Sequence, residues 1–575
     1  MNKCLSYLLS ASISGIVFLS VTGIPHEVYN YHILSSLFGT IIGCYVAFAF
    51  FLLCRNGYSV KLSWLDGMIM GFLFFYWINL KQFSNIYNVG YICLLLLYLL
   101  VRNTITIRTN LLYYGGVCTL IFLSIWGYLQ YGRLLPSPNP YFTVTGAFYN
   151  PAYLGLTLSI LMEIAIHVFI FYIHRSPKNK MQWGLALFAI LISLPVLIGT
   201  NSRTAWISLI VPLLISYTPL PKRITWKTVT LITTLIGIIF ILSATFYIIR
   251  PSSANGRLLI WKVSWEMMKD RPLTGFGKGG FEANYLYYQA RYMTENANEE
   301  EKYLAGNTHI AFNEPLRIGV EHGILGLTVY LLFIFILSIY APHKKTLSIR
   351  ILKTILLAVA LQGLFSYPNL MFPVMNISVI ALALLSKSIR QIQTFPIPIL
   401  YIKAVLTVAI LALALPVFNR YSAYHKLYTG IQERSFYNQP HQLTLLVQQL
   451  QDDNAVLTYY CNVMQRANDD KETWLMISEL EKRHPTPSLF ITKGDLLQKQ
   501  NKLNEAETAY LIAINMVPSK QKAKGRLVFL YKRMGKQEKA KRLAHQLLTE
   551  KVKNYGFETF ELHEKLKKEF PELNE

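Results

Sequence analysis

The residues in this chain that are best suited to chemistry lie around one histidine, His309. It belongs to the sequence Asn-Thr-His-Ile-Ala-Phe-Asn-Glu at positions 307–314. A neutral imidazole accepts a proton from a hydroxyl group near physiological pH, so His309 is a candidate general base. A structural role is the alternative, because a lone histidine is more often structural than catalytic. Polar neighbours are candidates for orienting its ring or binding a substrate: Asn307, Asn313, Glu314 and Glu321.

Arginines at two places are suited to binding a phosphate group. Arg203 occurs in Gly-Thr-Asn-Ser-Arg-Thr-Ala-Trp at positions 199–206, while Arg250 and Arg257 open a polar stretch at 250–313 that includes His309. A guanidinium group keeps its charge, and its planar fork contacts two phosphate oxygens at once. For Arg203 the alternative is an anchor whose charged end reaches the membrane–water boundary.

The polar stretch begins with a predicted helix that runs to about Lys269, with Ser253 or Asn255 as its N-terminal cap. Arg257 then lies in the first turn, where the helix dipole opposes a cation unless an anion binds beside it. An amphipathic helix anchored at the membrane surface by Trp261 and Trp265 is a second interpretation, and it is compatible with the first.

A glycine-rich sequence follows at 272–281, Pro-Leu-Thr-Gly-Phe-Gly-Lys-Gly-Gly-Phe. It differs from a nucleotide-binding phosphate loop because Gly279, rather than Ser or Thr, follows Lys278. We therefore expect a turn that shapes the large loop, with no nucleotide bound.

Together these sequences resemble those of the O-antigen ligase and polymerase superfamily. The resemblance rests on their order: Asn-Ser-Arg after an apolar span, Arg-x-x-x-Trp opening a large loop, Pro-Leu-x-Gly-x-Gly within it, and Asn-x-His-x-x-x-x-Glu closing it before Gly319 and Gly326. Gly-Ala-Phe-Tyr-Asn-Pro at 146–151 is similar to a further element of the family. The similarity is most specific between residues 146 and 326.

The resemblance implies a glycosyltransferase that takes its glycan from a polyprenyl-diphosphate-linked donor, without a metal or any other cofactor. Arg203 and Arg257 are then expected to bind the donor diphosphate and to stabilise the leaving group. His309 is expected to activate the acceptor hydroxyl as general base, so that direct displacement inverts the anomeric centre. Arg250 is a further candidate for binding the substrate.

Members of the superfamily use three kinds of acceptor. Ligases use a lipid A-core sugar, polymerases a second lipid-linked glycan, and O-oligosaccharyltransferases a Ser or Thr of an exported protein. A soluble repeat domain after the last span is more typical of the protein-glycosylating members. The same domain also suits the docking of a partner protein by a ligase, so the acceptor stays open.

Composition and hydropathy predict an all-α fold, a polytopic membrane helix bundle of about 12–14 transmembrane helices followed by a soluble helical domain. Hydrophobic residues make up 53% of the 575 residues and charged residues only 15%. Apolar runs near the length that a bilayer requires continue to about residue 418. We expect a membrane glycosyltransferase domain at 1–419, with its large extracytoplasmic loop at 250–314, and a helical-repeat domain at 420–575.

The distribution of basic residues predicts the orientation. The thirteen candidate spans lie near 5–23, 33–54, 64–80, 88–101, 111–130, 152–174, 181–199, 204–219, 229–249, 315–341, 350–367, 370–388 and 399–418. Lys and Arg are concentrated in alternate short loops, a pattern that marks the cytoplasmic side. A cytoplasmic N-terminus follows, with the large loop and the C-terminal domain in the periplasm of a bacterial inner membrane. The first span lacks a convincing cleavage site and is expected to be retained.

The formal net charge of +24 comes mostly from these loops and from a basic tail. Because the basic residues are dispersed rather than gathered on one face, we expect no nucleic-acid partner. The six cysteines lack metal-ligand spacing, and the exported parts hold only one of them, so we expect no metal site and no structural disulfide.

The tail contains an internal repeat with a period of 34 residues. Tyr531 takes the place of Leu497, and Ala540 takes the place of Ala506. This period resembles that of tetratricopeptide repeats, which stack helix pairs into concave surfaces for partner proteins. The alternative is a solvent-exposed helical cap without a ligand.

Two other classes of function compete with an enzyme. A transporter or flippase of lipid-linked glycans would use the same arginines to hold a diphosphate. Transporters place such charges near the middle of the membrane and often show two similar halves, whereas here the charges gather on one side and no repeat relates the halves. A scaffold embedded in membrane lipids would not need thirteen spans, so we favour an enzyme.

Overall fold

The structure is a computed structural model that describes residues 2–22, 31–53, 59–78, 86–104, 107–218, 226, 230, 233–234, 237, 251–340, 346–388, 394–553 and 555–573. These residues are predominantly helical. Contacts divide the chain into two compact units. The first comprises Met1–Phe246, Phe312–Glu314 and Val329–Ser422, and the second comprises Tyr247–Ala311, Pro315–Thr328 and Ala423–Glu575.

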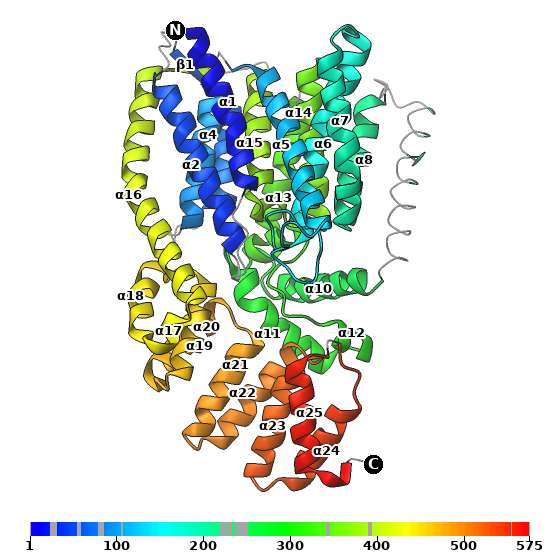
Figure 1. The fold of residues 1–575 in the computed structure, drawn as a ribbon, viewed down its shortest axis with the longest axis vertical. Coiled ribbons are helices and arrows are strands. Elements are labelled where there is room, and N and C mark those ends of the chain that lie inside the picture. The colour runs from blue at the N-terminus through cyan, green and yellow to red at the C-terminus, as the bar shows by residue number, and fades with distance from the viewer. Residues whose placement is uncertain are drawn as a thin grey trace. The chain divides into compact units, whose positions relative to one another are not determined.

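The first unit is a bundle of apolar helices, which Figure 1 shows running side by side. Its helices are α1 (Asn2–Val21), α2 (Tyr31–Leu53), α3 (Trp64–Trp77), α4 (Ile86–Asn103), α5 (Thr109–Tyr131), α6 (Pro151–Arg175), α7 (Lys180–Gly199), α8 (Arg203–Tyr217), α14 (Leu347–Phe365) and α15 (Phe372–Ser388), with the short 3-10 helix η2 (Pro368–Leu370). The later part of α13 (Glu314–Tyr340) and most of α16 (Ile399–Gln432) also belong to this unit.

The helices of this unit are apolar, and most of them have the length of a membrane span. Among the residues that the structure describes, eight helices are long and apolar enough to cross a membrane, and four further apolar helices are shorter. These twelve coincide with twelve of the predicted spans, while the predicted span at 229–249 lies almost wholly outside the described residues. The all-α membrane bundle expected from the sequence is confirmed.

Hydrogen bonds between buried polar side chains fix the neighbours of α8. Gln362 of α14 donates through Nε2 to the Leu156 carbonyl of α6 at 3.1 Å and to Ser208 Oγ of α8 at 3.3 Å. Ser159 Oγ of α6 lies 3.1 Å from Ser208 Oγ. Such contacts hold apolar helices in one register, because hydrocarbon offers their polar groups no other partner. They set the position of α8, which begins at Arg203.

One end of the bundle is closed by a short antiparallel pair of strands, β1 (Ser59–Ser63) and β2 (Thr394–Pro398). Ser63 then caps α3, and Asp66 completes the capping box by accepting a bond from the Ser63 N–H at 2.8 Å. Asp66 also forms a buried ion pair with Arg102 of α4, Nε to Oδ1 at 2.8 Å. Ser386 donates to the same carboxylate at 2.6 Å, so the buried charges are paired and hydrogen-bonded.

The second unit contains the large loop and the tail. The loop forms α10 (Pro251–Asp270), α11 (Gly280–Glu295) and α12 (Glu299–Leu304). The tail forms α17 (Ser435–Asn438), α18 (Pro440–Leu450), α19 (Asn454–Arg466), α20 (Asp470–Arg483), α21 (Pro487–Lys499), α22 (Leu503–Met516), α23 (Gln521–Arg533), α24 (Gln537–Thr549), α25 (Phe557–Glu569) and η3 (Pro571–Leu573).

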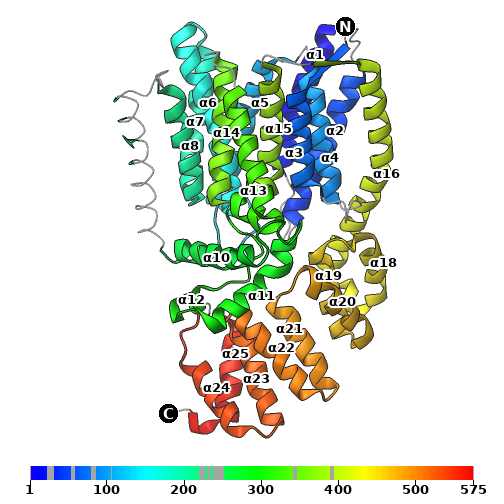
Figure 2. The ribbon, with the colours of Figure 1, turned by 180° about the vertical axis from the view of Figure 1, so that it is seen from behind.

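Helix pairs repeat along the tail, as the stacked helices α21 to α25 show in Figure 2. The pair α21–α22 starts at Pro487, and the pair α23–α24 starts at Gln521, 34 residues later. Gly494 of α21 faces the ring of Tyr510 of α22 at a distance that leaves no room for a side chain. The predicted period is therefore present in the helices, while the assignment to the tetratricopeptide family stays a prediction.

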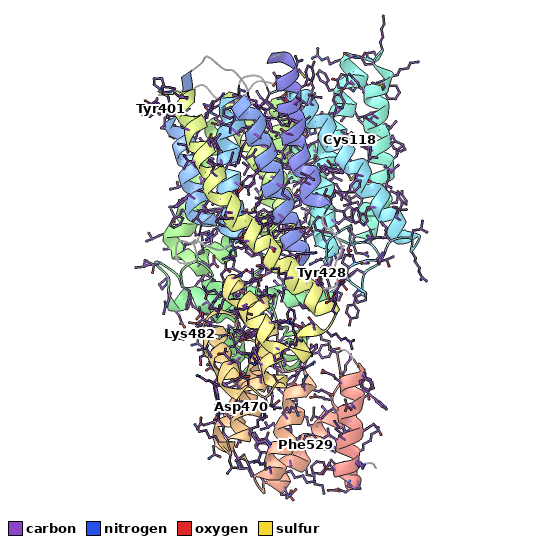
Figure 3. All side chains as sticks on the ribbon, turned by 60° about the vertical axis from the view of Figure 1, so that its left-hand side comes forward. Cys118, Tyr401, Tyr428, Asp470, Lys482 and Phe529 are labelled. Carbon is purple, nitrogen blue, oxygen red and sulfur yellow. The ribbon has the colours of Figure 1, made fainter. Side chains whose placement is uncertain are left out.

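The helix α16 is longer than the span predicted at 399–418, because it continues without a break to Gln432. Tyr401 and Tyr428 lie near its two ends in Figure 3, which also labels Asp470 and Lys482 of α20. Within the second unit, α11 packs against both α20 and α22. A helix of the large loop thus lies against helices of the tail.

Candidate active site

Arg203 is the first residue of α8 and follows a tight turn. Asn201 has a φ of 51°, and the Ser202 N–H donates to Thr200 Oγ1 at 3.3 Å. The turn lies against α6 at Gly155, where a Cβ atom would come within 2.7 Å of Ser202 Cβ. Glycine at this point lets the turn approach α6 closely. The Arg203 side chain is half-buried at a helix N-terminus, the end that attracts anions.

The sequence Gly-Ala-Phe-Tyr-Asn-Pro leads directly into α6. Asn150 caps the helix by accepting a bond from the Ala152 N–H at 2.9 Å, and its Nδ2 donates to Tyr367 Oη at 2.7 Å. The ring of Tyr367 lies 5.3 Å from that of Phe312, measured between centroids. The side chain of Tyr367 therefore links Asn150 to the segment that closes the large loop.

Asn313 and Glu314 hold this closing segment against α14. Asn313 donates through Nδ2 to the Leu364 carbonyl at 3.1 Å, which satisfies one of the last carbonyls of α14. Glu314 begins α13, is only 2% exposed, and packs against Gly363. Both predicted substrate-binding residues thus have structural contacts that position the end of the loop.

Arg257 lies in the second turn of α10 and not in its first turn as predicted, and its side chain is half-buried. The predicted cap of this helix is wrong, because α10 begins at Pro251 and places both Ser253 and Asn255 inside the helix. Proline is favoured in a first turn, where its missing N–H is not needed. Asn255 instead donates to Glu300 Oε1 at 3.0 Å. Arg250, the other arginine predicted at this end of the loop, lies outside the described residues.

Two contacts tie α10 to the rest of the loop. Trp261 donates through Nε1 to the Ala311 carbonyl at 3.2 Å, so it holds the segment that carries His309. Lys262 forms an ion pair with Glu301 of α12 at 2.6 Å. Trp261 was expected to anchor the helix in the membrane surface, and the structure shows that its indole N–H has a partner within the protein.

His309 lies in a cluster with three polar residues of the second unit. Its ring packs against that of His484 in a tilted arrangement, with centroids 4.1 Å apart and an interplanar angle of 31°. His484 Nδ1 lies 2.6 Å from Glu282 Oε1, and Asn454 donates through Nδ2 to the same oxygen at 2.9 Å. Glu282 belongs to α11, whereas Asn454 and His484 belong to the tail, so loop and tail together surround the candidate base.

The surroundings of His309 favour its neutral form. Burial lowers the pKa of His309 to about 4; the charge of His484 adds to this effect, and Glu282 opposes it. Burial alone would raise the pKa of Glu282, but its bond to His484 and the nearby imidazoles hold that pKa below its ordinary value. His309 is thus neutral near physiological pH and can accept a proton, and the Glu282 carboxylate partly offsets the cost that burial imposes on the charged form.

The glycine-rich sequence closes around a break in α13. The helix is interrupted at Gly323, with φ 64° and ψ −167°. The freed N–H of Ile324 donates to the Pro272 carbonyl at 2.8 Å, and the freed carbonyl of Glu321 accepts from the Gly277 N–H at 2.8 Å. The glycine-rich sequence thus forms a turn, as predicted, and this turn is hydrogen-bonded to the broken helix α13.

Glu321 sits at this break and is 4% exposed. One of its oxygens accepts from the Gly279 N–H at 3.0 Å, and the other pairs with Arg317 at 2.7 Å. Burial lowers the pKa of nearby Lys278 to about 7; Glu321 opposes the shift and Arg317 adds to it. Glu321 therefore holds the glycine-rich turn in place.

Asn307, the remaining predicted substrate-binding residue, lies two positions before His309 in the sequence, and its side chain is exposed.

The sequence of one part of the chain matches a known family. Residues 186–331 match the family Wzy_C, described as O-Antigen ligase. This stretch of the chain is therefore similar to the Wzy_C domain of the O-antigen ligase superfamily. A search of curated proteins finds no match.

The Wzy_C match contains every residue that was proposed from the sequence for the site: Arg203, Arg250, Arg257, Asn307, His309, Asn313, Glu314 and Glu321. The structure adds four residues whose roles the sequence did not predict: Asn150, Glu282, Tyr367 and His484. Two of them, Tyr367 and His484, lie beyond the end of the Wzy_C match. The sequence did offer a signal for Glu282, because this carboxylate lies in the first turn after the glycine-rich sequence.

Proposed function

We propose that this protein transfers a glycan from a polyprenyl-diphosphate-linked donor to an acceptor hydroxyl at the periplasmic face of a bacterial inner membrane. The Wzy_C match supports a glycosyltransferase of the ligase and polymerase type. The observation that carries the proposal is His309, a neutral imidazole held beside a hydrogen-bonded carboxylate within the matched domain.

In the proposed reaction the acceptor hydroxyl oxygen attacks the anomeric carbon of the donor glycan. The bond between that carbon and the phosphate oxygen breaks, and its electron pair leaves with the polyprenyl diphosphate. The hydroxyl proton passes to His309, so one displacement inverts the anomeric centre. Arg203 and Arg257 stabilise the negative charge that develops on the leaving diphosphate.

The chain itself supports the cooperation of these residues. Phe312 follows His309 by three residues, so the covalent chain keeps their Cα atoms within about 11 Å. Phe312 contacts Tyr367, which binds Asn150 at the start of α6, and α6 also carries the glycine against which the turn before Arg203 packs. Within the first unit, these contacts support the proposal that Arg203 and the end of the large loop act near the start of α6.

Two acceptors are proposed, a lipid A-core sugar and a Ser or Thr of an exported protein. The first follows the description of the matched family, and the second follows the soluble helical tail. A polymerase of the same superfamily would use a second lipid-linked glycan instead.

The test is a deletion strain complemented with the wild-type gene, with His309→Ala or with His545→Ala. A general base contributes roughly 100- to 10,000-fold to a rate, so His309→Ala should abolish detectable glycan transfer. His545 is exposed in α24 and serves as the control, with wild-type transfer expected. Lipopolysaccharide and exported glycoproteins are analysed in the same cells, and the one that loses its glycan identifies the acceptor class. Normal transfer by His309→Ala at normal membrane levels would refute the proposed role of His309.

A further inference from the structure

The contact between His309 and His484 joins two distant parts of the sequence. His309 lies in the loop after α12, and His484 caps the C-terminus of α20 in the tail. Their rings are 4.1 Å apart between centroids and inclined by only 31°, so one ring lies over the other. The side chain that stacks on the candidate base therefore comes from the C-terminal helical domain.

The position of His484 is fixed from two directions. Its backbone N–H donates to the Leu480 carbonyl at 2.7 Å, which closes the end of α20. Its Nδ1 is bonded to Glu282 Oε1 at 2.6 Å, and Asn454 of α19 also donates to that oxygen. A ring that is held at both its backbone and its side chain has little freedom to rotate.

We propose that His484 is a positioning residue for His309, and that the C-terminal helical domain thereby completes the catalytic site. This inference rests on the proposed function, because it assigns His484 a role only through His309. The fixed ring of His484 limits the His309 imidazole to one plane, and Glu282 and Asn454 keep His484 in place. In the transfer reaction His484 touches neither glycan, and the proton of the acceptor hydroxyl goes to His309.

The charged groups around His309 also predict a specific pH dependence. The groups that face it are Glu282 from α11 and His484 from the end of α20, while Asn454 from α19 is neutral. Burial and the charge of His484 both lower the pKa of His309, and Glu282 raises it. His309 is then neutral, and able to accept a proton, at every pH above about 4.

Replacing His484 therefore changes the acid side of the pH–rate profile. In His484→Phe an aromatic ring remains, but the charge and the bond to Glu282 are lost. The pKa of His309 should rise toward 6.5, so transfer should decline at a higher pH than in the wild-type protein. Since burial is the larger cause and persists, we expect a partial shift. His484→Ala loses the ring as well and should be slower than His484→Phe at every pH.

The experiment uses the full-length protein purified in detergent, with a lipid-linked glycan donor, and follows initial rates between pH 4 and pH 8. His545→Phe is the matched control, because this histidine is exposed in the same domain, and its profile should equal that of the wild type. An unchanged profile in both His484 variants would overturn the inference. Equal rates for His484→Phe and His484→Ala would also count against a role of the ring.

A second measurement separates this inference from the proposed function. Diethylpyrocarbonate acylates neutral imidazole, so peptide mass spectrometry of the treated protein gives the titration of His309 without any transfer reaction. The midpoint for His309 should be higher in His484→Phe than in the wild type, and an unmoved midpoint contradicts the inference. If His309→Ala retains transfer, the proposed function fails whatever the midpoint does.

Discussion

An arginine at the position of Arg203 is unfavourable for the stability of its helix. It begins α8, where the helix dipole attracts anions and opposes cations. The turn before it is built tightly on Gly155, which directs this helix terminus to one place on α6. A guanidinium and a helix N-terminus at one point together suit a doubly charged phosphate group.

Arg203→Lys tests whether the planar fork of the guanidinium matters. Lysine keeps the charge but cannot make two parallel bonds, and one charge-assisted bond is worth roughly 1.5–3 kcal/mol. We expect the rate of glycan transfer to fall by about tenfold or more, measured with the purified protein at low donor concentration. Arg175→Lys, at the exposed end of α6, should leave the rate unchanged. A normal rate for Arg203→Lys would favour the alternative role as a membrane anchor.

At the level of residues, the sequence predicted the types of group at the site better than their contacts. His309 is a candidate because polar residues surround it in the sequence. His484 was not one, since nothing within the tail distinguishes it from an ordinary C-terminal histidine of a helix. Glu314 is occupied with packing against α14, a role that only the folded chain reveals. Side-chain contacts between distant segments depend on tertiary packing, which local patterns do not encode.

Among the elements, the broken helix α13 determines the form of the large loop. Its break exposes backbone groups that the glycine-rich sequence satisfies, with Phe276 N–H donating to the Val320 carbonyl at 2.9 Å. The two stretches are thus coupled, because a continuous α13 would leave the loop without these partners. The angles at Gly323 belong to a region that other residues avoid.

Gly323→Ala should disturb this coupling. Alanine in such a conformation costs about 1–3 kcal/mol, and its Cβ would run into the Leu273 backbone. We expect a lower unfolding temperature and faster proteolysis of the loop at 270–280, both measured on the purified protein. Gly184→Ala in α7 is the control, because a Cβ at that position meets nothing within 4 Å. If Gly323→Ala and Gly184→Ala had equal effects, the break in α13 would not depend on the absence of a side chain at position 323.

The elements themselves were largely predictable. Apolar runs gave the spans because helices in a membrane must satisfy their own backbone groups. The predicted start of α10 was wrong by a few residues, because a proline such as Pro251 can begin a helix just as a polar capping residue can. The continuation of α16 to Gln432 was missed too, because hydropathy marks the end of the apolar span and not the end of the helix.

For the whole molecule, the shared unit of loop and tail constrains the topology. Glu282 of the loop and His484 of the tail are bonded at 2.6 Å, so both lie on the same side of any membrane. The chain between them passes through α13, α14, α15 and α16, an even number of helices with spanning character or apolar composition. An even number of spans between loop and tail is consistent with the prediction from the basic loops, which puts both on one side of the membrane.

Reporter fusions test the side directly. Basic residues after α6, at Arg175, Lys178 and Lys180, predict that this connection is cytoplasmic. Three spans follow it, α7, α8 and the span predicted from the sequence at 229–249, so we expect His309 and the tail in the periplasm. Alkaline phosphatase folds only after export, so a fusion after Glu575 should be active and a fusion after Lys178 inactive. Green fluorescent protein should fluoresce at Met1 and not at Glu575. The reverse pattern would place His309 in the cytoplasm, and a donor presented at the periplasmic face would then be out of its reach.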